Sequence, residues 1–160
     1  MAFTCGVGSA SAASSFSRVS GVRRSWLTDA SSAVRAGAEV RVAADAGLAA
    51  TIRPNAIKRA LSNLVMNAAA HGEHVELAAR ATPAGGVEIT IDDDGPGIPP
   101  ERFEEAFTPF GRLDEARNQN AKGVGLGLAI ARDVARGHGG EVTLDRSPLG
   151  GLRAVVRLPG

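Results

Sequence analysis

Apolar residues recur along this chain with two different periods, and these periods predict its secondary structure. From Pro54 onward the apolar positions follow helical spacing, and Gly72 ends the pattern. A second helical pattern extends from about Leu126 to Arg136, and a short helix is expected after Pro100. The sequence therefore predicts one long helix and two shorter ones.

Alternation of apolar and polar residues predicts strands elsewhere. Residues 39–43 form one short alternating segment, and residues 75–79 and 87–91 flank a Thr-Pro-Ala-Gly-Gly turn as a hairpin. Residues 141–145 and 152–158 predict a closing hairpin. The predicted fold class is α/β, a two-layer sandwich in which a mixed, mostly antiparallel sheet packs against helices.

Composition narrows the class of protein without naming a function. A chain of 160 residues suits one domain with a real core, and a net charge of +1 predicts neither nucleic acid nor an anionic membrane as a partner. No apolar run approaches the roughly 18 residues that span a bilayer. The single cysteine, Cys5, excludes an intrachain disulfide and fits a reducing compartment.

The first 30 residues differ from the rest of the chain. They are rich in Ser, Ala and Gly, and residues 1–28 contain arginines but no acid. We expect residues 1–30 to be a disordered or atypical leader, or the product of an imprecise gene start. A transit peptide is the alternative interpretation of the same composition.

Two asparagines lie on one face of the long predicted helix. Asn63 and Asn67 are four residues apart and flank its apolar stripe, although Asn is a poor residue for a helix interior. Carboxamide oxygens are suitable ligands for Mg²⁺, which also takes oxygens from phosphates. An exposed helix face with two incidental amides is the alternative.

An Asp-Gly-Pro-Gly sequence follows the strand predicted at residues 87–91. Asp94 at the rim of the sheet could accept a hydrogen bond from an exocyclic amine, and Gly95 and Gly97 allow a sharp turn beside a flat ligand. A common turn after a strand is the alternative. Asp92 and Asp93 precede it, but alternation directs Asp93 away from its neighbours, which argues against a single metal-ligand set.

A second glycine cluster, Gly123 to Gly127, opens the helix predicted at Leu126. Glycines at a helix N-terminus let backbone N–H groups approach a phosphate. The cluster is not a P-loop, because no Gly-Lys-Ser/Thr follows, and not a Rossmann fingerprint, because it follows a polar loop at residues 111–122. Such a loop beside a site is often a lid.

Four segments together resemble a known family. Asn63–Ala68, Asp94–Ile98, Phe107–Phe110 and Gly123–Ala129 are similar, in order and spacing, to the N, G1, F and G2 boxes of sensor histidine kinases. The resemblance covers about residues 38–159 and is to the catalytic ATP-binding domain, of the GHKL superfamily. It implies a Bergerat-type sandwich that binds ATP with Mg²⁺.

The resemblance also implies roles for individual residues. Asn67 would be the Mg²⁺ ligand, Asp94 would bind the adenine amine, and residues 111–122 would form the ATP lid. Phe107 and Phe110 would anchor the base of that lid. The implied nucleotide contacts are Asn63, Asn67, His71, Asp94, Gly95, Gly97, Ile98, Phe110, Lys122, Gly123, Val124, Gly125, Leu126, Gly127 and Leu128.

Two positions depart from the family pattern near the metal-binding asparagine. Family members often carry a basic residue and then an aromatic one where this chain has Ala70 and His71. Loss of the cation predicts weaker nucleotide binding unless Lys122 or Arg117 compensates. His71 either stacks on adenine or, as a histidine at a helix C-terminus, interacts with the helix dipole.

The acceptor motif of a histidine kinase is the larger departure. The three histidines, His71, His74 and His138, are not followed by the acid that such a motif carries. We therefore expect a histidine kinase catalytic domain that lacks its dimerisation domain and has no catalytic residue in cis. Its γ-phosphate would go to a His on a partner domain, and a response regulator would act downstream.

Alternatives from other functional classes remain open at this point. A gyrase-type ATPase or an anti-sigma serine kinase is disfavoured, because Asn63 stands where those proteins place a general-base Glu. A free-standing nucleotide-binding or regulator-docking module without kinase activity is the third possibility. We expect a cytoplasmic location, with membrane attachment possible through a partner.

Overall fold

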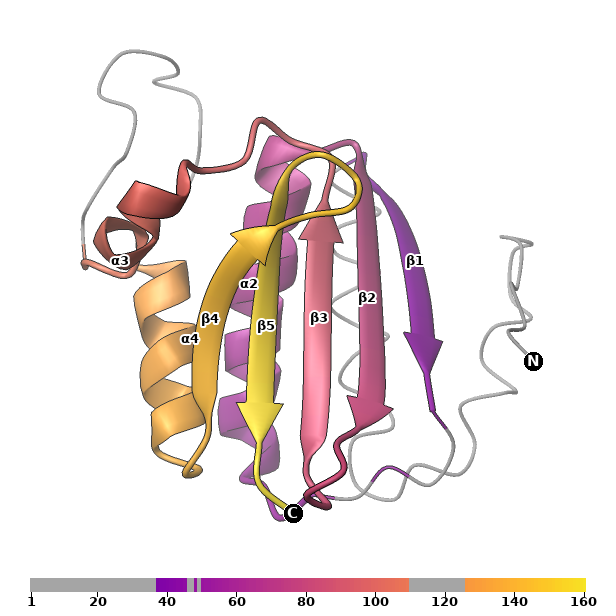
Figure 1. Cartoon of the computed structure of the whole chain (residues 1–160), viewed down its shortest axis with the longest axis vertical. Helices are drawn as coiled ribbons and strands as arrows, with labels where there is room; N and C mark the ends of the chain where they lie inside the picture. Colours follow the sequence, from indigo (N-terminus) through magenta and orange to yellow (C-terminus); the bar gives the residue numbers. More distant parts are fainter. Residues whose placement is uncertain (1–36, 46–47, 49, 110–125) are drawn as a thin grey trace.

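Five strands form one sheet in a computed structural model that describes residues 37–45, 48, 50–109 and 126–160 (Figure 1). Their spatial order is β1-β2-β3-β5-β4. The strands and their bounds are β1 (Glu39–Ala44), β2 (His74–Ala81), β3 (Val87–Asp93), β4 (Glu141–Arg146) and β5 (Leu152–Leu158).

The sheet is mixed, and its one parallel pair needs a crossover. The β2–β3, β3–β5 and β4–β5 pairs are antiparallel, whereas β1 pairs with β2 in parallel, with Glu39 opposite His74. Parallel neighbours cannot be joined by a tight turn. The connection from β1 to β2 runs through α2 (Pro54–His71), which covers the sheet. The predicted two-layer, mostly antiparallel α/β sandwich is confirmed.

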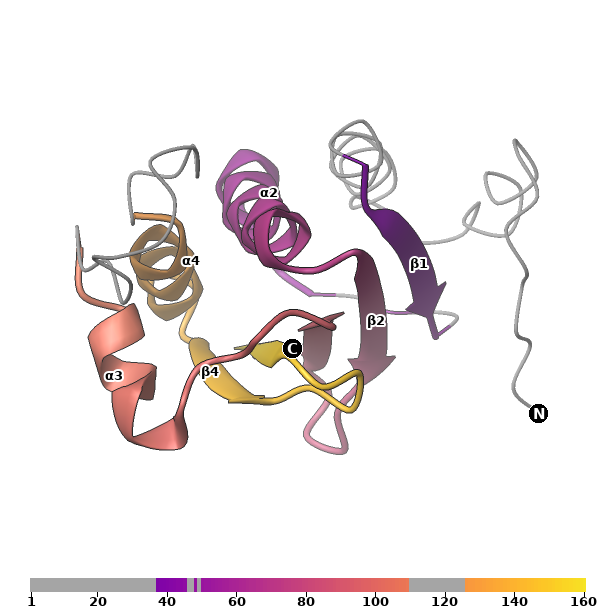
Figure 2. The ribbon, with the colours of Figure 1, turned by 90° about the horizontal axis from the view of Figure 1, so that it is seen from above.

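Helices cover one face of the sheet (Figure 2). Besides α2, this layer contains α4 (Gly127–Arg136). The short α3 (Phe103–Ala106), which follows a 3₁₀ turn at Pro100–Arg102, lies beside α4, beyond the edge strand β4. Both longer helices are amphipathic, and none of the helices in the described ranges is long and apolar enough to cross a membrane. Their apolar stripes therefore serve packing against the sheet.

The core lies between α2, α4 and the inward row of each strand. In β3 that row comprises Val87, Ile89 and Ile91, each no more than 7% exposed. Burying a side chain of this size stabilises the fold by about 1.5–3 kcal/mol. The α2 residues that complete the layer are Ile57, Ala60, Leu61, Leu64, Val65 and Ala68.

His138 joins the start of α2 to the end of α4. Its Nε2 lies 2.9 Å from the backbone nitrogen of Arg53, and its Nδ1 lies 2.7 Å from the carbonyl oxygen of Val134. The Arg53 N–H can only donate and the Val134 carbonyl can only accept. A neutral imidazole with its proton on Nδ1 satisfies both bonds, so His138 is a structural residue in this fold.

Candidate functional site

One side of α2 carries three polar residues on successive turns. Asn63, Asn67 and His71 follow one another at four-residue spacing, so they form a row along the helix. Nδ2 of Asn63 is buried and has no hydrogen-bond partner among the described residues. A buried donor without an acceptor is costly, so this atom favours a ligand that brings an oxygen.

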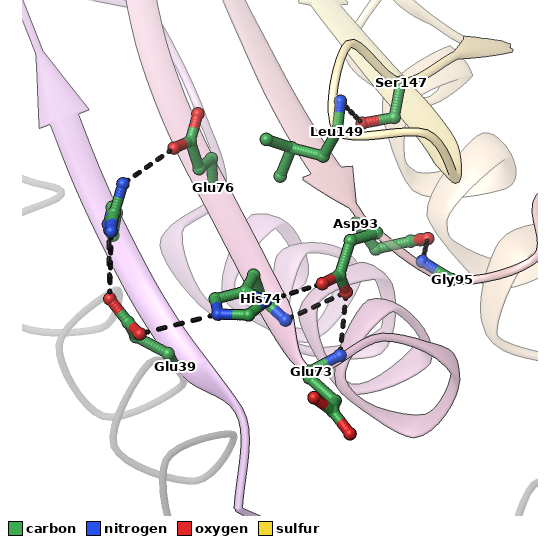
Figure 3. Close-up of polar contacts among 10 residues, drawn as sticks. Glu39, Glu73, His74, Glu76, Asp93, Gly95, Ser147 and Leu149 are labelled. Carbon is green, nitrogen blue, oxygen red and sulfur yellow. Dashed lines mark hydrogen bonds and ion pairs between the residues drawn. The ribbon is translucent and has the colours of Figure 1, made fainter.

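Asp93 ends the inward row of β3 and is only 3% exposed. Its Oδ1 accepts a hydrogen bond from the backbone N–H of Gly95 at 2.9 Å (Figure 3). The same oxygen accepts the backbone N–H of Leu152 at 3.1 Å. No residue in the described ranges gives its Oδ2 a hydrogen bond. Burial raises the pKa of Asp93 despite these two donors. A ligand amine at Oδ2 would supply the missing donor.

Asp94 has a different environment. Its Oδ1 accepts the backbone N–H groups of Glu73, at 2.8 Å, and His74, at 2.9 Å, and its Oδ2 lies 2.6 Å from Nδ1 of His74. A Cβ on Gly72 would lie 2.7 Å from Oδ1 of Asp94, so the α2–β2 connection needs a glycine there. These bonds tie Asp94 to the start of β2.

The three consecutive aspartates thus have three separate partners. Asp92 forms an ion pair with Arg153 of the neighbouring strand at 2.7 Å, on the face opposite the helices. The expectation that they form no common ligand set agrees with this geometry. However, the inward row Val87, Ile89, Ile91 continues to Asp93 and not to Asp94, because side chains alternate along a strand.

The two glycines after Asp94 lie where larger residues do not fit. A Cβ on Gly95 would lie 2.6 Å from the carbonyl oxygen of His71, which places this turn against the end of α2. Gly97 has a φ of +68°, a left-handed conformation that favours glycine. Ile98 is partly buried and packs against the core.

The turn between β4 and β5 also contacts Asp93, through Gly151. The N–H of Gly151 donates to the carbonyl oxygen of Asp93 at 3.1 Å, and a Cβ on Gly151 would lie 2.1 Å from its Oδ1. Asp93, Gly151 and Leu152 were not predicted from the sequence as candidate site residues. Strict alternation from Val87 was the available signal for Asp93, but no local pattern indicates that this distant turn is close to it.

The N-terminus of α4 forms the second end of the site. A Cβ on Gly127 would lie 3.5 Å from the Cβ of Asn63, so α4 begins directly against α2. Leu126 is the N-cap residue, and no side chain of the described residues caps the helix. Leu128 is partly buried against the core. The first amides of α4 therefore lack intrahelical partners and favour an anion.

The site is elongated along α2. His71, beside Gly95, marks one end and Asn63, beside Gly127, marks the other. Eight residues at 1.5 Å rise separate these ends by about 12 Å, with Asn67 midway. The structure thus brings together Asn63, Asn67, His71, Gly95, Gly97 and Leu126–Leu128. Phe110, Lys122, Gly123, Val124, Gly125, the loop at 111–122 and the leader at 1–30 lie outside the described residues.

A separate hollow lies on the other face of the sheet. Its volume is about 230 Å³, and its lining residues are Glu39, Arg41, His74, Glu76, Asp94 and Leu149. Glu39 approaches both Arg41, at 3.2 Å, and His74, at 3.7 Å. Side chains of opposite charge already satisfy one another there, and none of the α2 asparagines takes part.

The His74–Asp94 pair predicts a pH-dependent contribution to stability. The hydrogen bond that the His74 imidazole donates to Asp94 raises the pKa of His74, as does the charge of Asp94, with Glu39 and Glu73 acting in the same direction. Hydrogen bonds from the backbone and side chain of His74 lower the pKa of Asp94 to about 2. The pair therefore stabilises fully below the unfolded His pKa of 6.5 and above the unfolded Asp pKa of 3.8.

We expect the free energy of unfolding to fall more on His74→Gln at about pH 5 than at about pH 9. Above the raised pKa, the folded imidazole is neutral and the ionic part of the pair is lost. Urea unfolding of both chains at the two pH values measures the difference. An equal cost of the substitution at both values would show that the pair contributes nothing through its charge.

Comparison with known proteins places this geometry in a family. Residues 52–160 match the family described as histidine kinase-, DNA gyrase B-, and HSP90-like ATPases. The chain is 47% identical over 106 residues to the sensor histidine kinase CpxA of Escherichia coli K12, covering 66% of this chain and 23% of CpxA. It is 45% identical over 107 residues to GtrS of Pseudomonas aeruginosa, covering 67% and 22%. The chain thus spans less than a quarter of these relatives.

Solved structures agree with the sequence comparisons. The mycobacterial sensor histidine kinase MprB superposes with a TM-score of 0.74 at 29% identity, covering 87% of this chain and 93% of that one. The ATP binding domain of PrrB from Mycobacterium tuberculosis gives 0.62 at 35% identity, covering 83% and 89%. The chain therefore belongs to the histidine kinase-, DNA gyrase B-, and HSP90-like ATPases, as a domain of the sensor histidine kinase type.

Proposed function

We propose that this domain binds ATP with Mg²⁺ and presents the γ-phosphate to a histidine of a separate helical domain. The observation that carries the proposal is the elongated site along α2. Within the described part of the chain, Oδ2 of Asp93 at one end has no donor and Nδ2 of Asn63 at the other end has no acceptor. A nucleotide has an amine-bearing base at one end and phosphate oxygens at the other.

At the base end, we propose that Asp93 takes the role that the resemblance assigned to Asp94. A carboxylate with one oxygen fixed by two backbone donors presents its other oxygen in a defined direction. Asp94 uses its oxygens on the start of β2 and so serves as a support. His71 adjoins the same turn, because its carbonyl oxygen lies against Gly95.

At the phosphate end, Asn63 and the first amides of α4 supply donors to phosphate oxygens. We propose that Asn67 is the protein ligand of the metal, and its carboxamide has no hydrogen bond to another residue in the described ranges. The residues present fit Mg²⁺, which binds through few protein oxygens together with substrate phosphates. When bound, Mg²⁺ neutralises charge on the phosphates.

The contribution of this chain to the proposed reaction is to position the γ-phosphate for the incoming imidazole. A nitrogen of the incoming imidazole forms a bond to the γ-phosphorus, the bond from that phosphorus to the β,γ-bridging oxygen breaks, and ADP leaves. Asn63 stands where a general-base carboxylate would be needed for activation of water, and a carboxamide cannot take that proton. The geometry therefore favours transfer to a group supplied from outside over hydrolysis.

The partners follow from this chemistry. We propose a histidine-bearing phosphotransfer domain and, downstream, a response regulator, since curated relatives are named sensor histidine kinases. These relatives are longer than this chain, so the same polypeptide or another one could carry the histidine domain. We further propose that the domain works on the cytoplasmic side, where ATP is available.

Removal of the metal and of its proposed ligand tests this function. Titration calorimetry of ATP into the chain should show binding that is at least about tenfold tighter with Mg²⁺ than with excess EDTA. Asn67→Ala should remove most of that difference, because it removes the carboxamide oxygen that we propose as the metal ligand. Weak residual binding without metal is expected from Asp93.

Asn55→Ala is the matched control, because Asn55 is an exposed residue at the other end of α2. It should bind ATP like the unsubstituted chain. Failure of the unsubstituted chain to bind ATP in either condition would contradict the proposed function. Equal dependence on Mg²⁺ in the Asn67→Ala chain would contradict only the metal assignment.

A further inference from the structure

The short helix α3 is attached mainly by side chains. It has four residues and lies beside α4, at the margin of the helical layer (Figure 2). A helix of this length is not stable by itself. Ala106 and Phe107 are buried, and Phe103 packs partly against the core. Side-chain contacts with the rest of the domain therefore hold α3 in place.

Arg132 of α4 makes the polar part of this attachment. Its Nη1 and Nη2 donate to the two oxygens of Glu104 at 2.8 and 3.2 Å, in a forked arrangement. Its guanidinium carbon lies 4.2 Å from the centroid of the Phe107 ring. Its Nε donates to Glu141 of β4 at 3.1 Å. One side chain thus joins α3, α4 and β4, and it is only 18% exposed.

The two helices that Arg132 joins flank the connection of residues 110–125. The chain enters this connection just after α3, at Pro109, and leaves it at Leu126, the N-cap residue of α4. The first turn of α4 adjoins Asn63 and has no side-chain cap from residues 37–45, 48, 50–109 or 126–160. Its order therefore depends on how firmly the surrounding elements are held.

We infer that Arg132 is a positioning residue for the phosphate end of the nucleotide. It holds α3 against α4 and so keeps the first amides of α4 in place beside Asn63. This inference rests on the proposed function. The charge pair with Glu104 alone would contribute little, because that carboxylate is 79% exposed. The two parallel hydrogen bonds to Glu104 and the stacking of the guanidinium on Phe107 fix the geometry of the contact. A lysine reproduces both interactions less well.

Arg132→Met should weaken the binding of ATP with Mg²⁺ by about five- to tenfold, measured by calorimetry. Binding of AMP, measured by NMR titration, should change less than about twofold, because AMP depends chiefly on the base end. Arg132→Lys should be intermediate for ATP. Amide hydrogen exchange at residues 103–107 should become faster in the methionine chain.

Arg136→Met is the matched control. Arg136 lies one turn further along α4 and bonds to the same Glu141, at 3.1 Å, but among the described residues it forms no hydrogen bond or ion pair with α3. It should leave both nucleotide affinities unchanged. An unchanged ATP affinity in Arg132→Met would overturn the inference. So would an equal loss for ATP and AMP with a lowered Tm, which would show a purely structural role.

Failure of the proposed function gives a different result. If the unsubstituted chain binds neither nucleotide, the proposed function is contradicted, together with the nucleotide role of Arg132. Hydrogen exchange at residues 103–107 then still decides whether Arg132 holds α3. Unchanged exchange there in Arg132→Met would overturn the attachment itself.

Discussion

Asp93→Asn should lower the affinity for ATP by about 100-fold, the effect of losing one buried hydrogen bond between a base amine and a charged acceptor. An asparagine has only one acceptor oxygen. If that oxygen keeps the N–H groups of Gly95 and Leu152, its NH₂ group faces the base amine. If the carboxamide rotates, its NH₂ group faces two backbone donors instead. In either orientation, the NH₂ group of the asparagine faces another hydrogen-bond donor.

The same substitution should leave thermal stability nearly unchanged. Burial raises the pKa of Asp93, which means that the charged form costs stability in the folded chain. Replacing it by a neutral residue of the same shape removes this cost while both backbone bonds can persist. Calorimetry and thermal unfolding of the same sample would separate loss of binding from loss of fold.

Asp94→Asn is the matched control for this prediction. An asparagine can still accept the backbone N–H groups of Glu73 and His74 and loses only the exposed pairing with the imidazole. ATP affinity should therefore change by no more than about threefold. The reverse ranking, with Asp94→Asn far more damaging than Asp93→Asn, would return the base-reading role to Asp94.

Gly151→Ala should abolish detectable ATP binding and lower the free energy of unfolding by about 1–3 kcal/mol. Its Cβ would lie 2.1 Å from Oδ1 of Asp93, 2.6 Å from the nitrogen of Gly95 and 2.7 Å from the carbonyl oxygen of Asp93. Two of these atoms belong to the backbone and cannot move alone. The Asp93 carboxylate would be displaced from both of its donors.

Gly137→Ala serves as the control for this prediction. At that position a Cβ would lie 3.4 Å from its nearest neighbour, the carbonyl oxygen of Asp133, and φ is −64°. It should leave ATP binding intact, as measured by the same calorimetric titration. Normal binding by the Gly151→Ala chain would show that the β4–β5 turn is not coupled to Asp93.

The elements of the fold could be predicted because each depends on local patterns. The apolar stripe of α2, its proline start and its glycine end are all within 19 residues, and both hairpins have turn residues between alternating strands. The parallel pairing of β1 with β2 could not be predicted in this way. It joins residues 35 positions apart, with Glu39 opposite His74, and depends on tertiary packing.

The site was predicted less completely than the fold. The row of Asn63, Asn67 and His71 follows from helical spacing, but the choice between adjacent aspartates depends on where β3 ends and bends. Asp93 still belongs to the strand, whereas Asp94 belongs to the following turn. The contact of Gly151 with Asp93 joins segments far apart in sequence, which no local pattern records.

The junction at His138 also bears on phosphorylation. Both ring nitrogens of His138 are occupied, one by the N–H of Arg53 and the other by the carbonyl of Val134. A phosphoryl group on either nitrogen would displace one of these bonds, which join the start of α2 to the end of α4. If the domain presents a γ-phosphate as proposed, these two bonds keep the His138 imidazole out of the reaction and protect the scaffold from modification.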